Sequence, residues 1–300
     1  MATVEGRFSE NSRASRINLT RSARTPFRNS FDTFMTILTG GFTILILIPL
    51  VAIVWDVARE GIGQLGIQSF TELPPPPGLT EGGFGNAIIG TIYTLGIGAA
   101  FSVPLGILAA VYLSEFGRGT QLAYMVKFAT NVLAGVPAIL AGLFAYTVVV
   151  LTTGTFSAFA GGVALSVVMV PIVLRATEEG LLLVPQEMRQ AAIGVGATKF
   201  QTISRIVIPA ALPSIATAVT LSLARAGGEA APLLFTALNN NFWSTDIWAP
   251  IATLPVLIYF YAIIPFKAQQ QLAWTAALVL LAIILTVSIS SRLLTRRKFQ

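Results

Sequence analysis

The sequence predicts an all-α, polytopic membrane protein with six transmembrane helices and both termini in the cytoplasm. Of its 300 residues, 54% are hydrophobic and only 11% are charged, whereas about 25% are charged in an ordinary soluble domain. Six apolar segments reach the roughly 20 residues that a helix needs to cross a bilayer. Of the 19 Lys and Arg residues, 16 fall on one side of these segments, and positive residues mark the cytoplasmic side.

The six predicted spans are continuous apolar segments, and only the fifth contains charged residues. Helices are expected because lipid offers no hydrogen bonds to the backbone, and the alternating pattern of a transmembrane barrel is missing. The predicted spans are residues 34–55, 86–113, 128–151, 156–174, 206–235 and 272–289.

A seventh apolar stretch, residues 248–266, is predicted to be an interfacial or re-entrant segment on the outer side. It contains three prolines and five aromatic residues. Prolines remove backbone donors and aromatic rings favour the membrane interface. A seventh span would also place the four cations near the C-terminus, Arg292, Arg296, Arg297 and Lys298, outside the cell.

The segments outside the spans are polar. Residues 1–31 contain six arginines and are predicted to be a disordered cytoplasmic tail or to contact the membrane surface, so that residues 32–300 form the transmembrane domain. The outer loop after the first span contains four consecutive prolines, Pro74 to Pro77. These favour a stiff, extended segment, either a spacer or a surface that braces an external partner.

Several functions are disfavoured by what the sequence lacks. It has no cysteine and no histidine, which disfavours disulfides, thiol nucleophiles and ordinary zinc sites. It contains no phosphate-binding loop for ATP and no hydrolase motif. The net charge of +6 is explained by cytoplasmic membrane flanks rather than by nucleic acid. We therefore expect a chain that is not an enzyme and binds no cofactor or metal of its own.

The cytoplasmic stretch 177–205 is the only long cytoplasmic connection between spans. Pro185 suits the first position of a helix, and residues 186–193 contain helix-forming residues. Gly194 and Gly196 then allow a bend, because glycine tolerates positive φ. The short helix would expose Met188, Ala191, Ala192 and Phe200. Such an apolar face needs a groove on a cytoplasmic partner.

This stretch resembles the EAA loop of ABC importer permeases. The resemblance rests on Gln190-Ala191-Ala192, on Gly196, and on residues 206–209, Ile-Val-Ile-Pro. Gln190 stands where the family has Glu, and Ile208 where it has Leu. The resemblance implies a type I permease fold, in which this loop is the coupling helix that docks into a partner ATPase. The residues expected to serve coupling are Glu187, Arg189, Gln190, Ala191, Ala192, Gly196 and Pro209.

The fifth predicted span contains Arg225 and Glu229, and an ionised side chain in the membrane costs about 2.5–3.5 kcal/mol on insertion scales. Their spacing places both on one helix face, close enough to pair. Gly227 and Gly228 thin the helix between them, and Pro232 should kink it. We predict that these five residues line an anion path, since a guanidinium suits an oxyanion. A static ion pair that sets helix register is the alternative.

Residues 222–236 also resemble the Arg-Ala-x-Gly-Glu-Thr-Ala-Pro-Leu signature of phosphate importer permeases, which form a PstA and PstC pair. Ala230 stands where Thr is common. The run 253–256, Thr-Leu-Pro-Val, resembles the PstA type, and the overall resemblance covers roughly residues 30 to 295.

The resemblance implies a multi-pass permease subunit for inorganic phosphate in a bacterial cytoplasmic membrane. Its implied partners are a homologous PstC-like permease, a PstB-like ATPase dimer that holds ATP and Mg, and an extracytoplasmic PstS-like phosphate-binding protein. Two alternatives stay open, namely a permease for another oxyanion such as sulfate or molybdate, and a non-transporting membrane scaffold that senses phosphate. An intramembrane enzyme would need a second catalytic side chain, for which the sequence offers no candidate.

Overall fold

The computed structural model describes residues 26–79 and 81–297, which form helices and no strands. The chain divides into two compact units, residues 1–55 and 56–300. The helices are α1 (Pro26–Ile62), α2 (Gln68–Thr71), α3 (Gly85–Val111), η1 (Tyr112–Phe116), α4 (Gln121–Gly135), α5 (Ala138–Ala145), η2 (Tyr146–Val150), α6 (Leu151–Thr153), α7 (Ala158–Leu182), α8 (Gln186–Gly194), α9 (Lys199–Thr202), η3 (Ile203–Val207), α10 (Ile208–Gly227), α11 (Ala231–Leu234), α12 (Leu254–Ile263) and α13 (Lys267–Arg297).

The all-helical prediction with several spans is confirmed. Five of the described helices are long and apolar enough to cross a membrane, and one bent helix pair would make a sixth. Three π-helical turns, η1, η2 and η3, interrupt or extend these helices. Such turns mark places where a helix departs from regular geometry, frequently at functional sites.

Helix α1 makes up most of what is described of the first unit. Every side chain from Ser30 to Trp55 is exposed and most are apolar, as expected of a helix that meets lipid or another subunit. The helix begins at Pro26, so the last six residues of the predicted polar tail are helical. The prediction of disorder for residues 1–25 lies outside the described residues.

Small residues let the central helices of the second unit approach closely. Along α3, Gly98 and Gly106 face α7, where a Cβ on Gly106 would lie 2.8 Å from the Cβ of Val173. On the α7 side of the same contact, a Cβ on Gly162 would lie 2.4 Å from the Ile97 side chain of α3. In lipid, where apolar burial does not drive helices together, this close van der Waals packing holds them.

The third predicted span, 128–151, is not one straight helix. Helix α4 ends at Gly135, α5 begins at Ala138, and the two form a 107° bend. Val136 between them is extended, with φ −70° and ψ 129°. The cause is Pro137, because the ring of a proline pushes the preceding residue out of the helical region. The prediction of a continuous third span did not account for this proline.

The fourth and fifth spans differ from their predicted bounds in opposite directions. Helix α7 continues to Leu182 instead of ending near residue 174. Helix α10 ends at Gly227 instead of running to residue 235, and the short helix α11 follows after Gly228. Two adjacent glycines weaken a helix, and Pro232 cannot donate to the carbonyl of Gly228. The fifth helix therefore ends where we had expected a kink.

The stretch 248–266 contains only the ten-residue helix α12. Ten helical residues rise about 15 Å, half of the roughly 30 Å hydrocarbon core. This length fits the prediction that the stretch is not a full span, and its interfacial or re-entrant nature stays a prediction.

The loop of residues 73–79, which contains the four prolines and which we call the proline loop, packs on α13. There the Gln269 side chain is 1% exposed, and its Nε2 donates to the Pro76 carbonyl at 3.0 Å.

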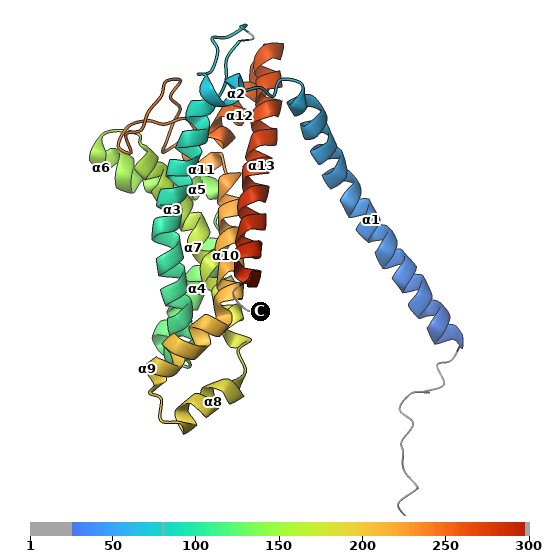
Figure 1. Cartoon of the computed structure of the whole chain (residues 1–300), viewed down its shortest axis with the longest axis vertical. Coiled ribbons are helices and arrows are strands. Elements are labelled where there is room, and N and C mark those ends of the chain that lie inside the picture. Colours follow the sequence, from blue (N-terminus) through green and yellow to red (C-terminus); the bar gives the residue numbers. More distant parts are fainter. Residues whose placement is uncertain (1–25, 80, 298–300) are drawn as a thin grey trace, which may run out of the picture. The chain divides into compact units, whose positions relative to one another are not determined.

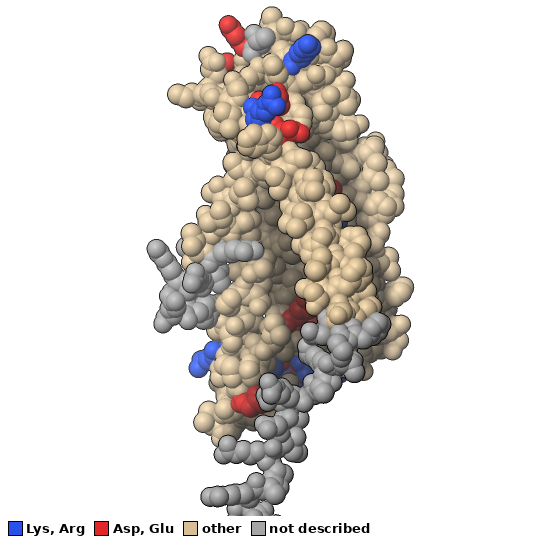
Figure 2. Space-filling view, turned by 90° about the vertical axis from the view of Figure 1, so that its right-hand side faces the viewer, with Lys and Arg blue, Asp and Glu red and all other residues tan. Residues whose placement is uncertain are grey.

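Within the second unit, α8 and α9 lie at the end opposite α2 and α12 (Figure 1). We call residues 183–207, which include α8 and α9, the coupling loop. Figure 2 shows that the charged side chains of the second unit lie mostly toward its two ends. This distribution is expected of a protein whose middle lies in lipid.

Candidate functional site

A cavity of about 260 Å³ lies where the α4–α5 bend faces α7 and α10. The bend opens this space because a 107° turn carries the α5 backbone away from the line of α4. Most of the lining is apolar, but two guanidinium groups also reach it. The lining residues are Leu133, Ala134, Val136, Ala138, Ala141, Val167, Val168, Pro171, Ile172, Arg175 and Arg225. We call this space the two-arginine cavity.

Arg175 is the lining residue that sequence reasoning missed. We had placed it in the cytoplasmic connection after the fourth span, but α7 continues through it. Its Nη2 donates a hydrogen bond to Asn131 Oδ1 of α4, so the side chain is held beside the bend. A signal was present in the sequence, because Val168, Pro171 and Arg175 share one face of a helix.

Arg225 lies in the last turn of α10, and its side chain is 62% exposed. Its Nε lies 3.9 Å from Glu229 Oε1. The predicted pairing therefore forms, but across the end of the helix and not on one helix face. Among the described residues the guanidinium has no hydrogen-bond partner. A long and partly exposed ion pair of this kind contributes about 0–1 kcal/mol to stability. This is little for a pair whose role would be to fix the register of the helix.

Arg175 and Arg225 line one cavity, and each carries a guanidinium, a group whose donors suit an oxyanion. Each guanidinium offers planar, forked donors that match a phosphate-like anion. Arg175 donates to the neutral side-chain amide of Asn131, and the Nε of Arg225 lies 3.9 Å from the carboxylate of Glu229. Neither partner neutralises both charges, so an anion that accepts from both groups would be favoured.

The other predicted path residues shape the backbone around Arg225. Gly227 is buried, and a Cβ there would contact Leu95 and Ile284. Gly228 is exposed and caps α10. Pro232 is buried in α11, where a Cβ on Gly142 of α5 would lie 2.6 Å from its Cα. These three residues are not among the lining residues of the two-arginine cavity.

The coupling loop has the bent form that the sequence predicted. Gly196 adopts φ +90°, a left-handed conformation, and no atom lies within 4 Å of where its Cβ would be. Thr198 then caps α9 in a capping box with Gln201. Exposed apolar side chains gather on the loop. They are Leu183, Met188, Ile193, Val195 and Phe200.

The seven predicted coupling residues fall into two groups. Glu187, Gln190, Ala191 and Gly196 are exposed, whereas Arg189 and Ala192 are buried and Pro209 is half-buried. Ala192 was expected on the exposed apolar face, but it faces the protein. Ile193 and Val195, which were not predicted to be exposed, are exposed apolar residues of this loop instead.

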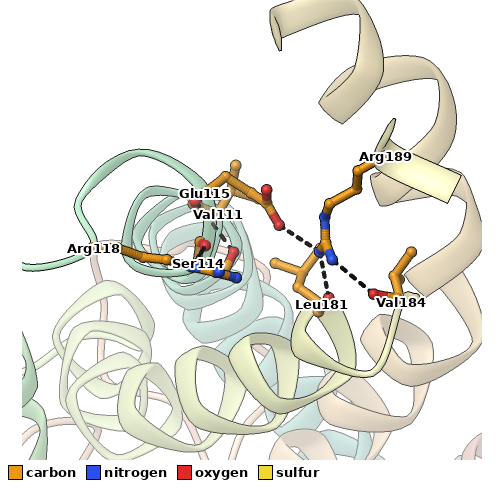
Figure 3. Close-up of polar contacts among 7 residues, drawn as sticks. All are labelled: Val111, Ser114, Glu115, Arg118, Leu181, Val184 and Arg189. Carbon is orange, nitrogen blue, oxygen red and sulfur yellow. Dashed lines mark hydrogen bonds and ion pairs between the residues drawn. The ribbon is translucent and has the colours of Figure 1, made fainter. Parts of the chain in front are cut away.

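Arg189 points inward, toward Glu115 of η1 and the end of α7 (Figure 3). Its Nη2 donates to Glu115 Oε1 at 2.8 Å and to the Leu181 carbonyl at 2.9 Å, and its Nη1 donates to the Val184 carbonyl at 2.7 Å. Sequence reasoning did not identify Glu115 as a partner, because nothing local connects it with a residue so distant in the chain.

Comparison with known proteins supports one family. A family model described as a binding-protein-dependent transport system inner membrane component matches residues 102–300. The chain is 42% identical over 249 residues to the phosphate transport system permease protein PstA of Yersinia pestis, covering 83% of this chain and 84% of that one. It is 38% identical over 264 residues to PstA 1 of Mycobacterium tuberculosis, covering 85% and 86%.

Solved structures share the fold. A bacterial alginate ABC transporter in complex with an alginate-bound periplasmic protein matches with a TM-score of 0.65 at 16% identity, covering 90% of this chain and 96% of that one. The MetNI methionine ABC transporter matches with a TM-score of 0.55 at 20% identity, covering 72% and 94%. The chain therefore belongs to the family of binding-protein-dependent transport system inner membrane components, in its PstA group.

Proposed function

We propose that this chain is the membrane-spanning permease subunit of an ATP-driven importer of inorganic phosphate. The observation that carries the proposal is the two-arginine cavity, in which Arg175 and Arg225 reach one space between apolar helices. Ionised groups inside a membrane protein are costly and usually line a pathway. The relatives at 42% and 38% identity are named as phosphate transport permeases, which agrees with a dianionic oxyanion as the substrate.

In this proposal the substrate exchanges one set of partners for another. Phosphate would accept hydrogen bonds from Arg175 and Arg225 while the cavity is open to one side. Glu229 would compete for Arg225 and so keep the anion from being held too tightly to leave. Asn131 would orient Arg175 through its side-chain amide. The other lining side chains are apolar and offer no competing charge, so the two guanidiniums supply the charge-assisted contacts.

Energy would come from a separate subunit through the coupling loop. The exposed apolar residues Met188, Ile193, Val195 and Phe200 would dock in a cleft of a PstB-like ATPase dimer, which would bind ATP and Mg. ATP-driven closure of that dimer would displace the loop and reorient α10 around Arg225. A homologous PstC-like permease would complete the path, and a PstS-like protein would deliver phosphate from outside.

The proposed orientation places α8 and α9 in the cytoplasm and the proline loop outside. The charge asymmetry of the sequence supports it, because Lys199 and Arg205 belong to the coupling loop and Arg118 closely follows η1, which contacts that loop. Both termini would then be cytoplasmic, in a bacterial cytoplasmic membrane.

The test is ATP-dependent phosphate uptake by the purified complex in vesicles. We expect Arg225→Ala to abolish uptake while the ATPase still copurifies, because the anion loses a donor that no neighbour replaces. Arg59→Ala is the matched control, since Arg59 is an exposed arginine outside the cavity. Normal phosphate uptake by Arg225→Ala would refute the anion-path role.

Competition separates the alternatives. Inhibition of uptake by sulfate or molybdate at the concentration of phosphate would favour a different oxyanion. A complex that copurifies with its partners but moves no anion would favour a non-transporting phosphate-sensing scaffold.

A further inference from the structure

The pair formed by Glu115 and Arg189 joins two segments that the chain order keeps apart. Glu115 belongs to η1, at the end of α3, and Arg189 belongs to α8 of the coupling loop. Their side chains are only 8% and 10% exposed, and the pair is separated by 74 residues in the sequence. Figure 3 shows the Arg189 side chain directed at Glu115 and at the carbonyls of Leu181 and Val184.

The hydrogen bonds of Arg189 restrain both the distance of α8 from η1 and the orientation of α8. Three hydrogen bonds, to Glu115, Leu181 and Val184, leave from its two terminal nitrogens. A planar guanidinium that is held at three points cannot rotate or slide without losing a bond. Only Nε, which is buried, lacks a partner in the described part of the chain. The contact therefore fixes α8 against both η1 and the end of α7.

A second contact joins the other arm of the coupling loop to the neighbouring residue of η1. The Nζ of Lys199, in α9, lies 5.0 Å from the ring centroid of Phe116, within the range of a cation–π interaction. In the same η1 turn, Leu113 packs in a buried cluster with Leu181, Val184 and Val207. The two arms of the loop thus meet the same five-residue turn.

The covalent connections of α8 are weaker restraints than this contact. Toward α7 it is joined by the three residues Leu183 to Pro185, and toward α9 by the bend at Gly196. Through these joints alone, α8 could swing without moving α3 or α4. The Glu115–Arg189 pair supplies the missing link, because η1 leads through a short connection into α4, which ends at the bend lining the two-arginine cavity.

We infer that Glu115 and Arg189 are a positioning pair that makes the coupling loop and the α3–α4 connection move as one body. Displacement of α8 then reaches the cavity through α4 as well as through α10. The inference rests on the proposed function for its transport consequence, but the rigid connection itself does not require phosphate to be the substrate.

The first test measures phosphate uptake per ATP hydrolysed by the reconstituted full complex. Glu115→Gln keeps the shape of the side chain and removes its charge, and Arg189→Lys removes the forked geometry. We expect each to keep the ATPase bound and active while uptake per ATP falls about fivefold or more, in line with ordinary coupling between distant sites. Arg118→Gln is the control, because Arg118 lies in the same connection and, within the part of the chain that the structure describes, donates only to the Ser114 carbonyl.

A double variant separates positioning from stability. Replacing both charges, as Glu115→Met with Arg189→Met, removes the buried ions together, a change that usually preserves stability. We expect the thermal unfolding midpoint to return toward the parent value while uptake per ATP stays low. Full recovery of uptake per ATP in the double variant would overturn the inference, and so would unchanged uptake per ATP in the two single variants.

The second test needs no substrate. The chain has no cysteine, so spin labels at Gln121→Cys and Gln186→Cys, two exposed positions at the starts of α4 and α8, report one distance in a complex whose other subunits carry no reactive cysteine. We expect this distance to be equal in the nucleotide-free and ATP-trapped states, and to change or broaden when Glu115→Gln is added. A distance that changes with nucleotide in the otherwise unaltered chain, or that ignores Glu115→Gln, would refute the rigid connection. Absence of uptake by the parent complex would instead refute the proposed function and leave this distance to decide the inference.

Discussion

At the scale of single residues, the placement of five charged groups matters most. Arg175 and Arg225 reach one cavity, Glu229 lies 3.9 Å from Arg225, and Glu115 and Arg189 form a nearly buried pair. Arg175 and Arg225 border a cavity and lack a close carboxylate. Arg189 is nearly buried and donates three hydrogen bonds, one of them to Glu115, so it has no room for a ligand. In the proposed mechanism, arginine lines a pathway in one place and forms a mechanical connection in another, and only its surroundings distinguish the two.

Arg175→Ala is predicted to lower phosphate uptake efficiency about 10- to 100-fold, because a hydrogen bond to a charged group is worth about 1.5–3 kcal/mol. Arg175→Lys should recover part of the uptake efficiency, because lysine keeps the positive charge but lacks the forked donors of a guanidinium. Initial uptake rates over a range of phosphate concentrations would measure the effect, with Arg59→Ala as the control. Equal efficiency in Arg175→Ala and the parent would remove Arg175 from the path.

At the scale of elements, broken helices provide the irregular backbone that a membrane protein tolerates only inside protein or beside a cavity. Pro137 separates α4 from α5, and the Gly227–Gly228 pair ends α10 before α11. The two breaks meet, because Gly142 of α5 packs directly on the backbone of Pro232. This contact sets how far α5 and α11 stand apart next to the two-arginine cavity.

Gly142→Ala is predicted to destabilise the permease by about 1–3 kcal/mol, the usual cost of overpacking. The added Cβ would lie 2.6 Å from the Pro232 Cα and 2.8 Å from its carbonyl oxygen, and backbone atoms cannot rotate aside. The thermal unfolding midpoint in detergent should fall. Gly135→Ala is the matched control, because a Cβ there meets nothing within 4 Å. Equal midpoints for both variants would contradict the close contact.

Gly196→Val is predicted to weaken attachment of the ATPase. A β-branched residue at φ +90° is strained by about 1–3 kcal/mol, and relieving the strain would swing α9 away from α8. Copurification of the ATPase with the tagged permease would measure the loss. Gly194→Ala provides the comparison, since Gly194 has open space and no positive φ. If both variants retain the ATPase equally, the bend has no part in docking.

At the scale of the whole molecule, the second unit has two polar ends separated by an apolar middle. One end carries the coupling loop, and the other carries the proline loop and the short helix α2. The Gln64 Nε2 donates to Gln271 Oε1 at 2.7 Å, which ties the start of this unit to the start of α13 at the second end. An importer needs this polarity, because its motor and its substrate supply are on opposite sides of the membrane.

The orientation is testable with single cysteines in this cysteine-free chain. Leu79→Cys, in the proline loop, should react with a membrane-impermeant maleimide in spheroplasts. Gln186→Cys, whose parent side chain is exposed at the start of α8, should react only in inverted vesicles. The expected pattern follows from the positive-inside rule. Labelling of both sites from the same side would show that the two ends do not face opposite compartments.

Much of this protein could be predicted from local sequence. The membrane class and the approximate positions of the spans follow from long apolar segments, and the coupling loop follows from Pro185 and Gly196. These features depend on consecutive residues, whose hydrophobicity and backbone preferences act locally. The bend at Pro137 was also available from the sequence, since a proline constrains its neighbour wherever it stands.

The tertiary structure alone decided which distant residues meet. Arg175 and Arg225 reach one cavity only because α4 breaks and α7 continues beyond its predicted end. Glu115 finds Arg189 across 74 residues of chain. Such contacts depend on how helices pack, and packing is set by the summed shape of many side chains rather than by any local pattern.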